Sequence, residues 1–201
     1  MNGSSTVVLL IRHAHTDAIG TRLVSRLPGV SLNAAGRVAA TRLGTVLARE
    51  LISAVYSSPL ERGLETAQRI ADARAVPLHA CDGLNEVDFG EWTGKTFVEL
   101  NAREDWRRFN EHRGSAMVPA GESAIDVQSR VLSCIAVLHD RHPGETVAAV
   151  SHADVIRPAL LHYMGLSLDD WQQIEIAPGT VSAISVDDSG GRVLYINRSS
   201  D

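Results

Sequence analysis

The chain has 201 residues, of which 44% are apolar and 21% charged, and its formal net charge at pH 7 is -5. This length and composition suffice for one full-sized hydrophobic core, and we expect a single domain over residues 1–201. The acidic balance argues against nucleic acid as a partner, because binding a phosphate backbone requires a broad basic surface. The first apolar run breaks at Arg12, too early for a secretory segment or a membrane span, so we expect a cytoplasmic protein without a membrane partner.

Continuous apolar runs alternate along the chain with stretches of helical periodicity. Runs without polar alternation are typical of strands that are buried on both faces of a parallel sheet. We therefore expect an α/β fold around a mostly parallel central sheet. The expected strands cover residues 7–11, 54–57, 76–80 and 146–150, followed by a terminal hairpin at 181–186 and 193–196.

Capping residues mark where the helices between these strands begin. Asn33 is an expected N-cap, residues 58–61 form a capping box with Pro59 at the first helical position, and residues 123–126 form a second box. The helix after the first box should run to about Arg74. A further helix is expected from about Val155, and it would tolerate Pro158 in its first turn.

The segment 97–113 and the two cysteines have no clear partner in the expected fold. Residues 97–113 have helical spacing but only a weak core face, and we expect a lid within residues 97–121. The two cysteines, Cys81 and Cys134, have no histidine nearby at the spacing of metal ligands. We expect two unpaired structural thiols.

Basic side chains stand directly after three of the expected strands. Arg12 and His13 follow the first strand, Arg62 lies in the first helical turn after the second, and His152 follows the fourth. Open α/β sheets bind ligands outside the carboxyl ends of their strands, so we expect these side chains to converge. Such a cluster predicts a site for a small phosphorylated molecule.

Each of these residues also has a structural interpretation, since a lone histidine at a strand end is more often structural than catalytic. A cation in the first turn of a helix opposes the macrodipole, so Arg62 calls for an anion, which could be a ligand or simply Glu61 or Glu65. His152 could be a satisfied core histidine. If it is functional, Asp154 is its expected orienting partner.

Several short motifs stand in a fixed order along most of the chain. They are Arg12-His13-Ala14-His15-Thr16, Leu32-Asn33-Ala34-Ala35-Gly36, the segment 57–67, Leu84-Asn85-Glu86 with residues 90–94, Gly121-Glu122-Ser123, and Ser151-His152 with Ile156-Arg157. In this order they resemble the signatures of the histidine phosphatase superfamily, also called the phosphoglycerate mutase-like family, of which the opening one is Arg-His-Gly-x-Thr.

The resemblance implies a three-layer αβα sandwich and a metal-independent phosphomonoester hydrolase of the histidine acid-type phosphatase class. In the family the first histidine attacks phosphorus, so His13 would form a phosphohistidine that water hydrolyses. Arg12, Arg62 and His152 would hold the phosphate oxygens, and Glu86 would protonate the leaving group. As bare sequence, other acids of the same loop could serve instead. The substrate would be a small phosphorylated metabolite and the product inorganic phosphate, with no cofactor and no metal.

The chain departs from the family pattern around its first motif. Ala14 replaces a glycine, which indicates a backbone that does not need positive φ, and His15 replaces the commoner Glu, Gln or Asn. A phosphate-contacting asparagine of one branch is missing. Arg26 is the expected substitute, unless it is a surface arginine. His15, Thr16 and Ala153 are further expected substrate contacts.

A metal site, two other functions and the oligomeric state stay open at this stage. His13, His15 and His152 could together hold a metal ion, although the neighbouring arginines would repel a cation. A cofactor-dependent phosphoglycerate mutase would carry a longer insertion than residues 94–121 provide. A non-catalytic phospho-ligand binding protein is disfavoured because both histidines, both arginines and the acid are present. A homodimer is compatible with the sequence.

Overall fold

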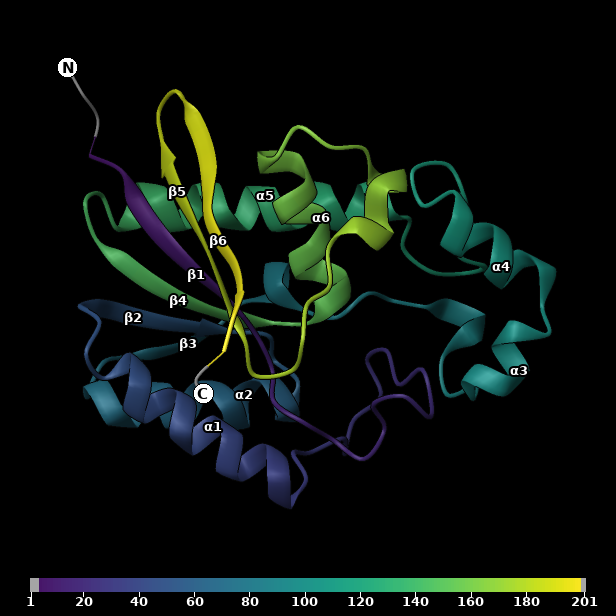
Figure 1. The fold of residues 1–201 in the computed structure, drawn as a ribbon, viewed down its shortest axis with the longest axis horizontal. Coiled ribbons are helices and arrows are strands. Elements are labelled where there is room, and N and C mark those ends of the chain that lie inside the picture. Colours follow the sequence, from purple (N-terminus) through teal and green to yellow (C-terminus); the bar gives the residue numbers. More distant parts are fainter. Residues whose placement is uncertain (1–3, 200–201) are drawn as a thin grey trace.

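The computed structural model describes residues 4–199 and contains one six-stranded sheet with the strand order β3-β2-β4-β1-β5-β6 (Figure 1). β1, β2, β3 and β4 are parallel, whereas β5 and β6 form an antiparallel hairpin that joins the sheet beside β1. The expected mostly parallel sheet and terminal hairpin are thereby confirmed. The strands are β1 Thr6–Arg12, β2 Ile52–Ser57, β3 Leu78–Ala80, β4 Thr146–Ser151, β5 Val181–Asp187 and β6 Gly190–Arg198.

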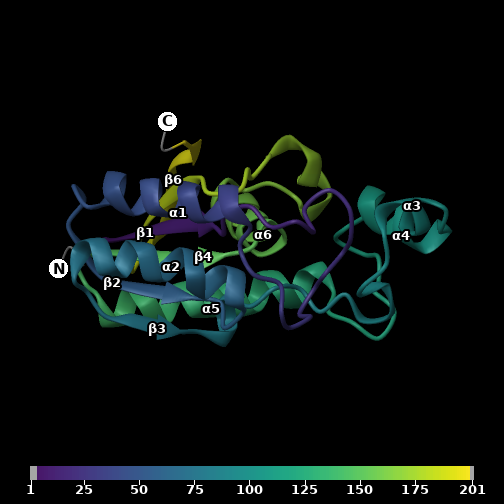
Figure 2. The same cartoon turned by 90° about the horizontal axis from the view of Figure 1, so that it is seen from below.

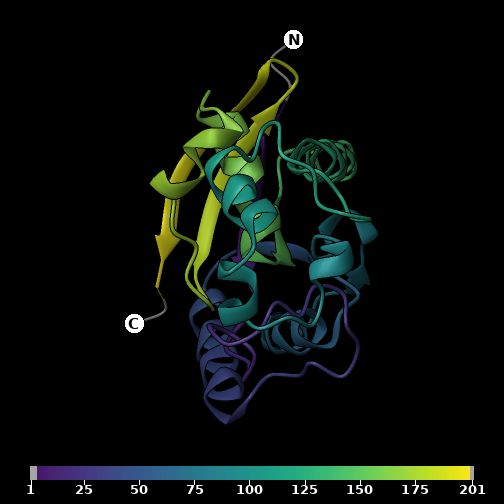
Figure 3. The same cartoon turned by 90° about the vertical axis from the view of Figure 1, so that its right-hand side faces the viewer.

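Helices cover both faces of this sheet, which confirms the three-layer α/β architecture. α1 (Ala34–Leu47) and α2 (Glu61–Arg74) lie on one face, and α5 (Ala124–Arg141) and α6 (Ala153–Tyr163) lie on the other (Figure 2). The two short helices α3 (Phe97–Asn101) and α4 (Glu104–Glu111) stand apart at one end of the molecule (Figures 1 and 2), the end that faces the viewer in Figure 3. Asn33 caps α1 by accepting from Gly36 N, and Ser123 forms the expected capping box with Asp126.

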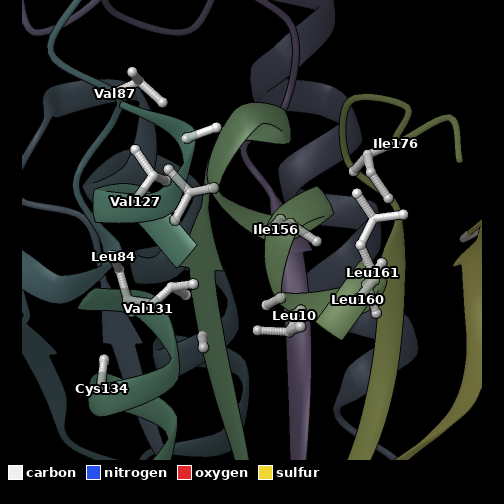
Figure 4. Packing of buried hydrophobic residues seen from close by; sticks show 14 of the residues in the cluster. Leu10, Leu84, Val87, Val127, Val131, Cys134, Ile156, Leu160, Leu161 and Ile176 are labelled. Carbon is white, nitrogen blue, oxygen red and sulfur yellow. The ribbon is translucent and has the colours of Figure 1, made fainter. Parts of the chain in front are cut away.

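The core has two halves because successive strand residues point to opposite faces of the sheet. Val8 and Leu10 pack with α5 and α6, whereas Leu9 and Ile11 pack with α1 and α2. Figure 4 shows part of the first half, in which Leu10 lies close to Leu160 and its neighbours on α6. Full burial of such a side chain contributes about 1.5–3 kcal/mol relative to its exposure, so β1 is firmly fixed between the helical layers.

The register of the central strands brings three chain segments to one edge of the sheet. Arg12, the last residue of β1, pairs with Ser151, the last residue of β4. Ser57, the last residue of β2, pairs with Val150. The segments that start with His13, Ser58 and His152 therefore leave the sheet side by side.

Two helix starts differ from the expectation. α2 begins at Glu61 after an extended Leu60 and has no side-chain cap, so the capping box predicted at residues 58–61 is wrong; the Ser58 hydroxyl accepts from Leu60 N at 3.3 Å and bonds to His152 at 2.8 Å. α6 begins at Ala153, two residues earlier than expected, which places Pro158 in its second turn. There the proline removes the N–H that would otherwise bond to the carbonyl of the fourth residue before it.

Residues 97–113 have a stronger core face than their composition suggested. Trp106 and Phe109 of α4 are buried and make edge-on contacts with Trp92, while Phe89 packs against both. Aromatic side chains bury large areas, so two of them, three positions apart, suffice to hold a short helix. The role of this segment as a lid stays a prediction. No helix among residues 4–199 is long and apolar enough to cross a membrane.

Candidate active site

His13 presents a free ring nitrogen at the carboxyl end of β1. Its backbone N–H donates to Ser151 O at 2.9 Å, and its Nδ1 donates to Ala14 O at 2.8 Å. The proton on Nδ1 leaves Nε2 with a lone pair. Burial, and after it the charge of Arg62, lowers the pKa of His13 to about 3. The ring is therefore neutral at neutral pH, which is the form a nucleophile requires.

Arg62 is a buried cation with unused hydrogen-bonding capacity. Its side chain is 1% exposed, its Nη2 donates to Ser25 O at 2.7 Å, and its Nη1 has no partner among the described residues. Neither Glu61 nor Glu65 pairs with it, because those carboxylates accept from backbone N–H groups of residues 29–32. An unpaired buried donor costs roughly 1–3 kcal/mol, so this site favours an anionic ligand.

Arg12 adds a second cation of the same kind. Its Nη1 donates to Ile176 O at 2.6 Å, and its Nε is buried without a partner among residues 4–199. Burial lowers its pKa. Because arginine keeps its charge in proteins, Arg12 and Arg62 both present positive charge to the same cavity as His13.

Glu86 faces these cations from the loop after β3. Its Oε2 lies 3.9 Å from Arg62 Nη2 and 3.3 Å from His152 Nδ1, and its Oε1 accepts from Val87 N. Burial, and after it the charge of Asp154, raises the pKa of Glu86 to about 7. A carboxyl group that exchanges its proton near neutral pH is suited to general acid–base work.

His152 lies behind His13 and is fully buried. The two ring centroids are 5.1 Å apart, and His152 Nε2 bonds to Ser58 Oγ at 2.8 Å. Its 3.3 Å contact with Glu86 lacks hydrogen-bond geometry. Asp154, the expected orienting partner, contacts Arg157 instead at 3.6 Å, so that prediction is wrong and Ser58 orients the ring. Asp154 points elsewhere because it lies in the first turn of α6.

Arg12, His13, Arg62 and Glu86 line a cavity of about 320 Å³, which has a second group of charges on its other wall. Arg113 lies between the rings of Phe109 and Trp171, 4.0 Å from each ring centroid. Arg157 lies 4.4 Å from the centroid of the same Trp171. We call Arg113, Trp171 and Arg157 the arginine–tryptophan stack. Arg113 is 5% exposed, and no carboxylate of residues 4–199 lies within 4.0 Å of its guanidinium.

Arg26 does not line this cavity, contrary to the expectation that it contacts substrate. Its Nε donates to Glu86 O at 2.7 Å, and its Nη2 forms an ion pair with Glu122 at 2.8 Å. Arg130 of α5 also contacts Glu122, at 2.9 Å, and donates to Glu86 O. The two arginines are thus held by the loop that carries Glu86, and they fix its backbone.

The remaining expected contacts divide into two groups. Thr16 and Ala153 line the cavity, whereas His15 is exposed and does not. Ala14 is buried and has no positive φ, as expected for a residue with a side chain. In the part of the chain that the structure describes, no three His, Cys, Asp or Glu side chains are grouped as a metal site would require.

Sequence reasoning missed Ser25 and the stack. Ser25 has a φ of 47°, its carbonyl accepts from Arg62, and its hydroxyl bonds to the backbone of Val87 and Phe89. Nothing in the local sequence marks this strained serine. Trp171 lies in a short 3-10 helix, Leu168–Gln173, and its sequence gives no sign that it faces the site; of the stack, only Arg157 belongs to a motif, the last one.

Comparisons with known proteins agree with this geometry. The sequence profile described as histidine phosphatase superfamily (branch 1) matches residues 8–199. Phosphoserine phosphatase 1 of Hydrogenobacter thermophilus is 29% identical over 192 residues, covering 94% of this chain and 91% of that protein. Glucosyl-3-phosphoglycerate phosphatase of Mycolicibacterium vanbaalenii is 28% identical over 173 residues, covering 82% and 76%. The solved structure of Bacillus stearothermophilus YhfR superposes with a TM-score of 0.89 at 29% identity, covering 94% of this chain and 96% of that one.

Proposed function

Because the chain belongs to the histidine phosphatase superfamily, we propose that it is a phosphomonoester hydrolase that works without a metal through a phosphohistidine at His13. The observation that carries this proposal is the neutral imidazole of His13, which opens into the same cavity as the buried, incompletely paired Arg12 and Arg62. A nucleophile beside two cations with unused donors suits attack on a phosphate dianion.

The proposed reaction has two displacements. His13 Nε2 attacks phosphorus, the bond from phosphorus to the ester oxygen breaks, and Glu86 gives its proton to the departing oxygen. Water then attacks the phosphohistidine, Glu86 takes up the proton of that water, and inorganic phosphate leaves. The pKa of Glu86, raised to about 7, allows the same carboxyl group to act as acid and then as base. Arg12 and Arg62 balance the charge on the transferring group.

His152 has a more indirect position in this proposal. It does not line the cavity, but its ring lies edge-on against that of His13 and its Nδ1 lies 3.3 Å from Glu86. We expect it to approach a phosphate oxygen beside His13 when the site is filled. A crystal grown with vanadate would show an oxygen within hydrogen-bonding distance of His152; a ring still separated from the anion by Glu86 would limit His152 to positioning that carboxyl group.

The other wall of the cavity suggests what the substrate carries besides its phosphate. About 320 Å³ lies at the low end of the range for small-molecule sites, so a small metabolite fits. Arg113 has no carboxylate partner within the described chain, and it lies over the same indole as a second cation, Arg157. Asp154 contacts Arg157 at 3.6 Å, so a second anionic group on the substrate would balance the charge of Arg113 above all. The names of the two phosphatase relatives describe substrates of this kind, since phosphoserine and glucosyl-3-phosphoglycerate each bear a carboxylate.

The proposal is tested by turnover in the presence of a chelator. The purified protein should release phosphate from p-nitrophenyl phosphate in excess EDTA, and rapid quenching should trap an acid-labile phosphoryl group. His13→Ala should lose both, with activity at least about a hundredfold lower, because losing a nucleophile costs orders of magnitude. Activity that disappears in EDTA would contradict the metal-free mechanism. Conversion of 3-phosphoglycerate only with added bisphosphoglycerate would favour the mutase, and binding without turnover would favour a phospho-ligand binding protein.

A further inference from the structure

The two cysteines, far apart in the sequence, meet outside the active site. Cys81 directly follows β3, and Cys134 lies in the middle of α5. Both thiols are free, and their Sγ atoms are 3.1 Å apart. A disulfide bond is about 2.05 Å long, so closing it requires a shift of only about 1 Å. The expectation of two separate structural thiols therefore misses their contact, which arises because the loop after β3 crosses α5.

Gly83 allows this close approach. A Cβ atom at position 83 would lie 2.6 Å from Cys134 Cβ and 3.2 Å from its Sγ, so any side chain there would push the loop away from α5. Arg130, one turn before Cys134, holds the same loop by donating to Gly83 O at 3.1 Å. The close approach at Gly83 and the hydrogen bond from the Arg130 side chain to Gly83 O thus keep the two thiols together.

The thiol pair can be reached from solvent. Both cysteines line a hollow of about 420 Å³, separate from the active-site cavity, whose wall also includes His79, Arg130 and Arg141. Cys81 is partly exposed, whereas Cys134 is buried. A small oxidant can therefore reach Cys81 first.

The environment also gives the two sulfurs different roles. A hydrogen bond from Cys134, followed by backbone N–H groups of Gly83 and Leu84, lowers the pKa of Cys81 to about 6 against the effect of burial. The same contact, together with burial, raises the pKa of Cys134. Cys81 is thus the more exposed and the more acidic thiol, and Cys134 the buried and less acidic one, the division found between an attacking and a resolving cysteine.

We propose that Cys81 and Cys134 are a site of reversible covalent modification, at which a peroxide converts the thiol pair into an intramolecular disulfide. Cys81 Sγ attacks a peroxide oxygen, the O–O bond breaks, and the products are a sulfenic acid on Cys81 and water or an alcohol. Cys134 Sγ then attacks Cys81 Sγ, the S–O bond breaks, and water leaves with the proton of Cys134. The two thiols are oxidised by two electrons and the peroxide is reduced by two. A dithiol reductant reverses the reaction.

The disulfide would tie the loop that carries Glu86 to α5. Cys81 precedes Glu86 by five positions, and the segment between them is already held by Ser151 Oγ, which donates to Leu84 O at 2.6 Å. The crosslink closes a loop of the chain without displacing that anchor. We therefore expect a more stable enzyme, with a melting temperature higher by about 5 °C or more, because crosslinking lowers the entropy of the unfolded chain.

The test uses the full chain and hydrogen peroxide. Wild-type protein should lose both thiols in a thiol titration, stay monomeric on a non-reducing gel, and lose about 2 Da, the mass of two hydrogen atoms. Peptide mapping should find the segments of Cys81 and Cys134 joined, and dithiothreitol should restore both thiols. The matched variants Cys81→Ser and Cys134→Ser should form no internal crosslink, and Cys134→Ser should instead leave a sulfenic acid that dimedone labels.

Other outcomes would overturn the proposal. They are retention of both thiols in peroxide, a mass gain on Cys81 of the wild type without a crosslink, or dimers joined between chains. A disulfide that forms no faster in the native protein than in urea would show that the fold does not position the pair. None of these results depends on the phosphatase proposal, because the thiol assay reads no turnover.

Discussion

The two walls of the active-site cavity hold their arginines in different ways. Arg12 and Arg62 come from a strand end and a helix start at the sheet edge, and backbone carbonyls fix them. Arg113 and Arg157 are held by aromatic rings, above all by Trp171, in segments outside the sheet. The proposed phosphate site is thus built on the ends of sheet-forming segments, whereas the second wall combines α6, which carries Arg157, with segments that connect helices, where proteins tolerate change.

The energetics of the two walls differ accordingly. A cation over an aromatic ring gains about 0.5–2 kcal/mol. In the stack, Arg113 Nη2 also donates to Asn110 Oδ1 at 2.8 Å and Arg157 pairs with Asp154 at 3.6 Å, so part of their hydrogen-bonding capacity is already used. A buried guanidinium bonded to a carbonyl is oriented more strictly, and its remaining donors point to one place. We therefore expect substitutions at the sheet edge to affect every substrate, and substitutions in the stack to affect only some.

The largest effect is expected for Arg62→Ala. It should lower kcat/KM for all phosphomonoesters about a thousandfold, because a preorganised cation on the transferring phosphoryl group is lost. Arg69→Ala, an exposed arginine of the same helix, serves as the matched control and should change little. A loss at Arg62 confined to substrates with a second anion would break the distinction between the walls.

Glu86→Gln should discriminate between leaving groups. An alkyl phosphate needs a proton on its departing oxygen and p-nitrophenyl phosphate does not, so the loss should be about a hundredfold larger for the alkyl ester. Glu91→Gln, an exposed acid in the same loop, is the control. Equal losses on both esters would mean that Glu86 holds the site together and that another group donates the proton.

Glu86→Gln should also change how the rate of alkyl phosphate hydrolysis depends on pH. In the free enzyme His13 must be deprotonated and Glu86 protonated, and their pKa values are about 3 and about 7. Hydrolysis of an alkyl phosphate should therefore fall as pH rises above about 7, where Glu86 loses its proton. This alkaline limb should disappear in Glu86→Gln, since the amide does not titrate. A limb that persists in the variant belongs to another group.

A smaller, selective effect is expected for Arg113→Gln. It should raise KM by about tenfold to a hundredfold for a phosphomonoester that carries a carboxylate, the range for losing a charge-assisted hydrogen bond, and leave p-nitrophenyl phosphate nearly unchanged. Arg108→Gln, an exposed arginine on the same segment, is the control. Equal effects on both substrates would show that the stack holds the fold of this segment rather than the substrate.

The smallest effect is expected for Asp154, whose charge acts on residues of both walls of the cavity. Its charge helps to raise the pKa of Glu86 and also acts on Arg113. Asp154→Asn should therefore lower the pKa of Glu86 and move the alkaline limb to lower pH, by less than about one unit. The double variant with Glu86→Gln should show no limb to move. A shift toward higher pH would contradict this electrostatic arrangement.

The sequence predicted the sheet-edge wall well and the other wall poorly. Continuous apolar runs are specific to buried parallel strands, and His13, Arg62 and His152 stand directly after such runs or at the following helix start. Their meeting therefore follows from topology alone. Arg113 and Trp171, by contrast, are brought together by the path of two irregular segments, and no periodic pattern encodes that path.

Local competition explains the errors at single residues. The Ser58 hydroxyl bonds to the buried imidazole of His152 and to Leu60 N rather than capping Glu61. Arg26 has the same charge whether it faces a substrate or Glu122, and only the folded loop decides. Such choices depend on partners distant in the sequence, so they lie beyond any reading of neighbouring residues.

Helix α1 has a mechanical role that follows from its two closely packed glycines. A Cβ atom on Gly36 would lie 2.1 Å from the carbonyl oxygen of His15, and one on Gly44 would lie 2.5 Å from that of Arg69 on α2. One end of α1 therefore rests on the turn after His13, and the other rests on the helix that bears Arg62. A side chain at either glycine would have to push α1 away from the turn after His13 or from the helix that bears Arg62, so we expect Gly36→Ala and Gly44→Ala to disturb the active site although neither residue lines it.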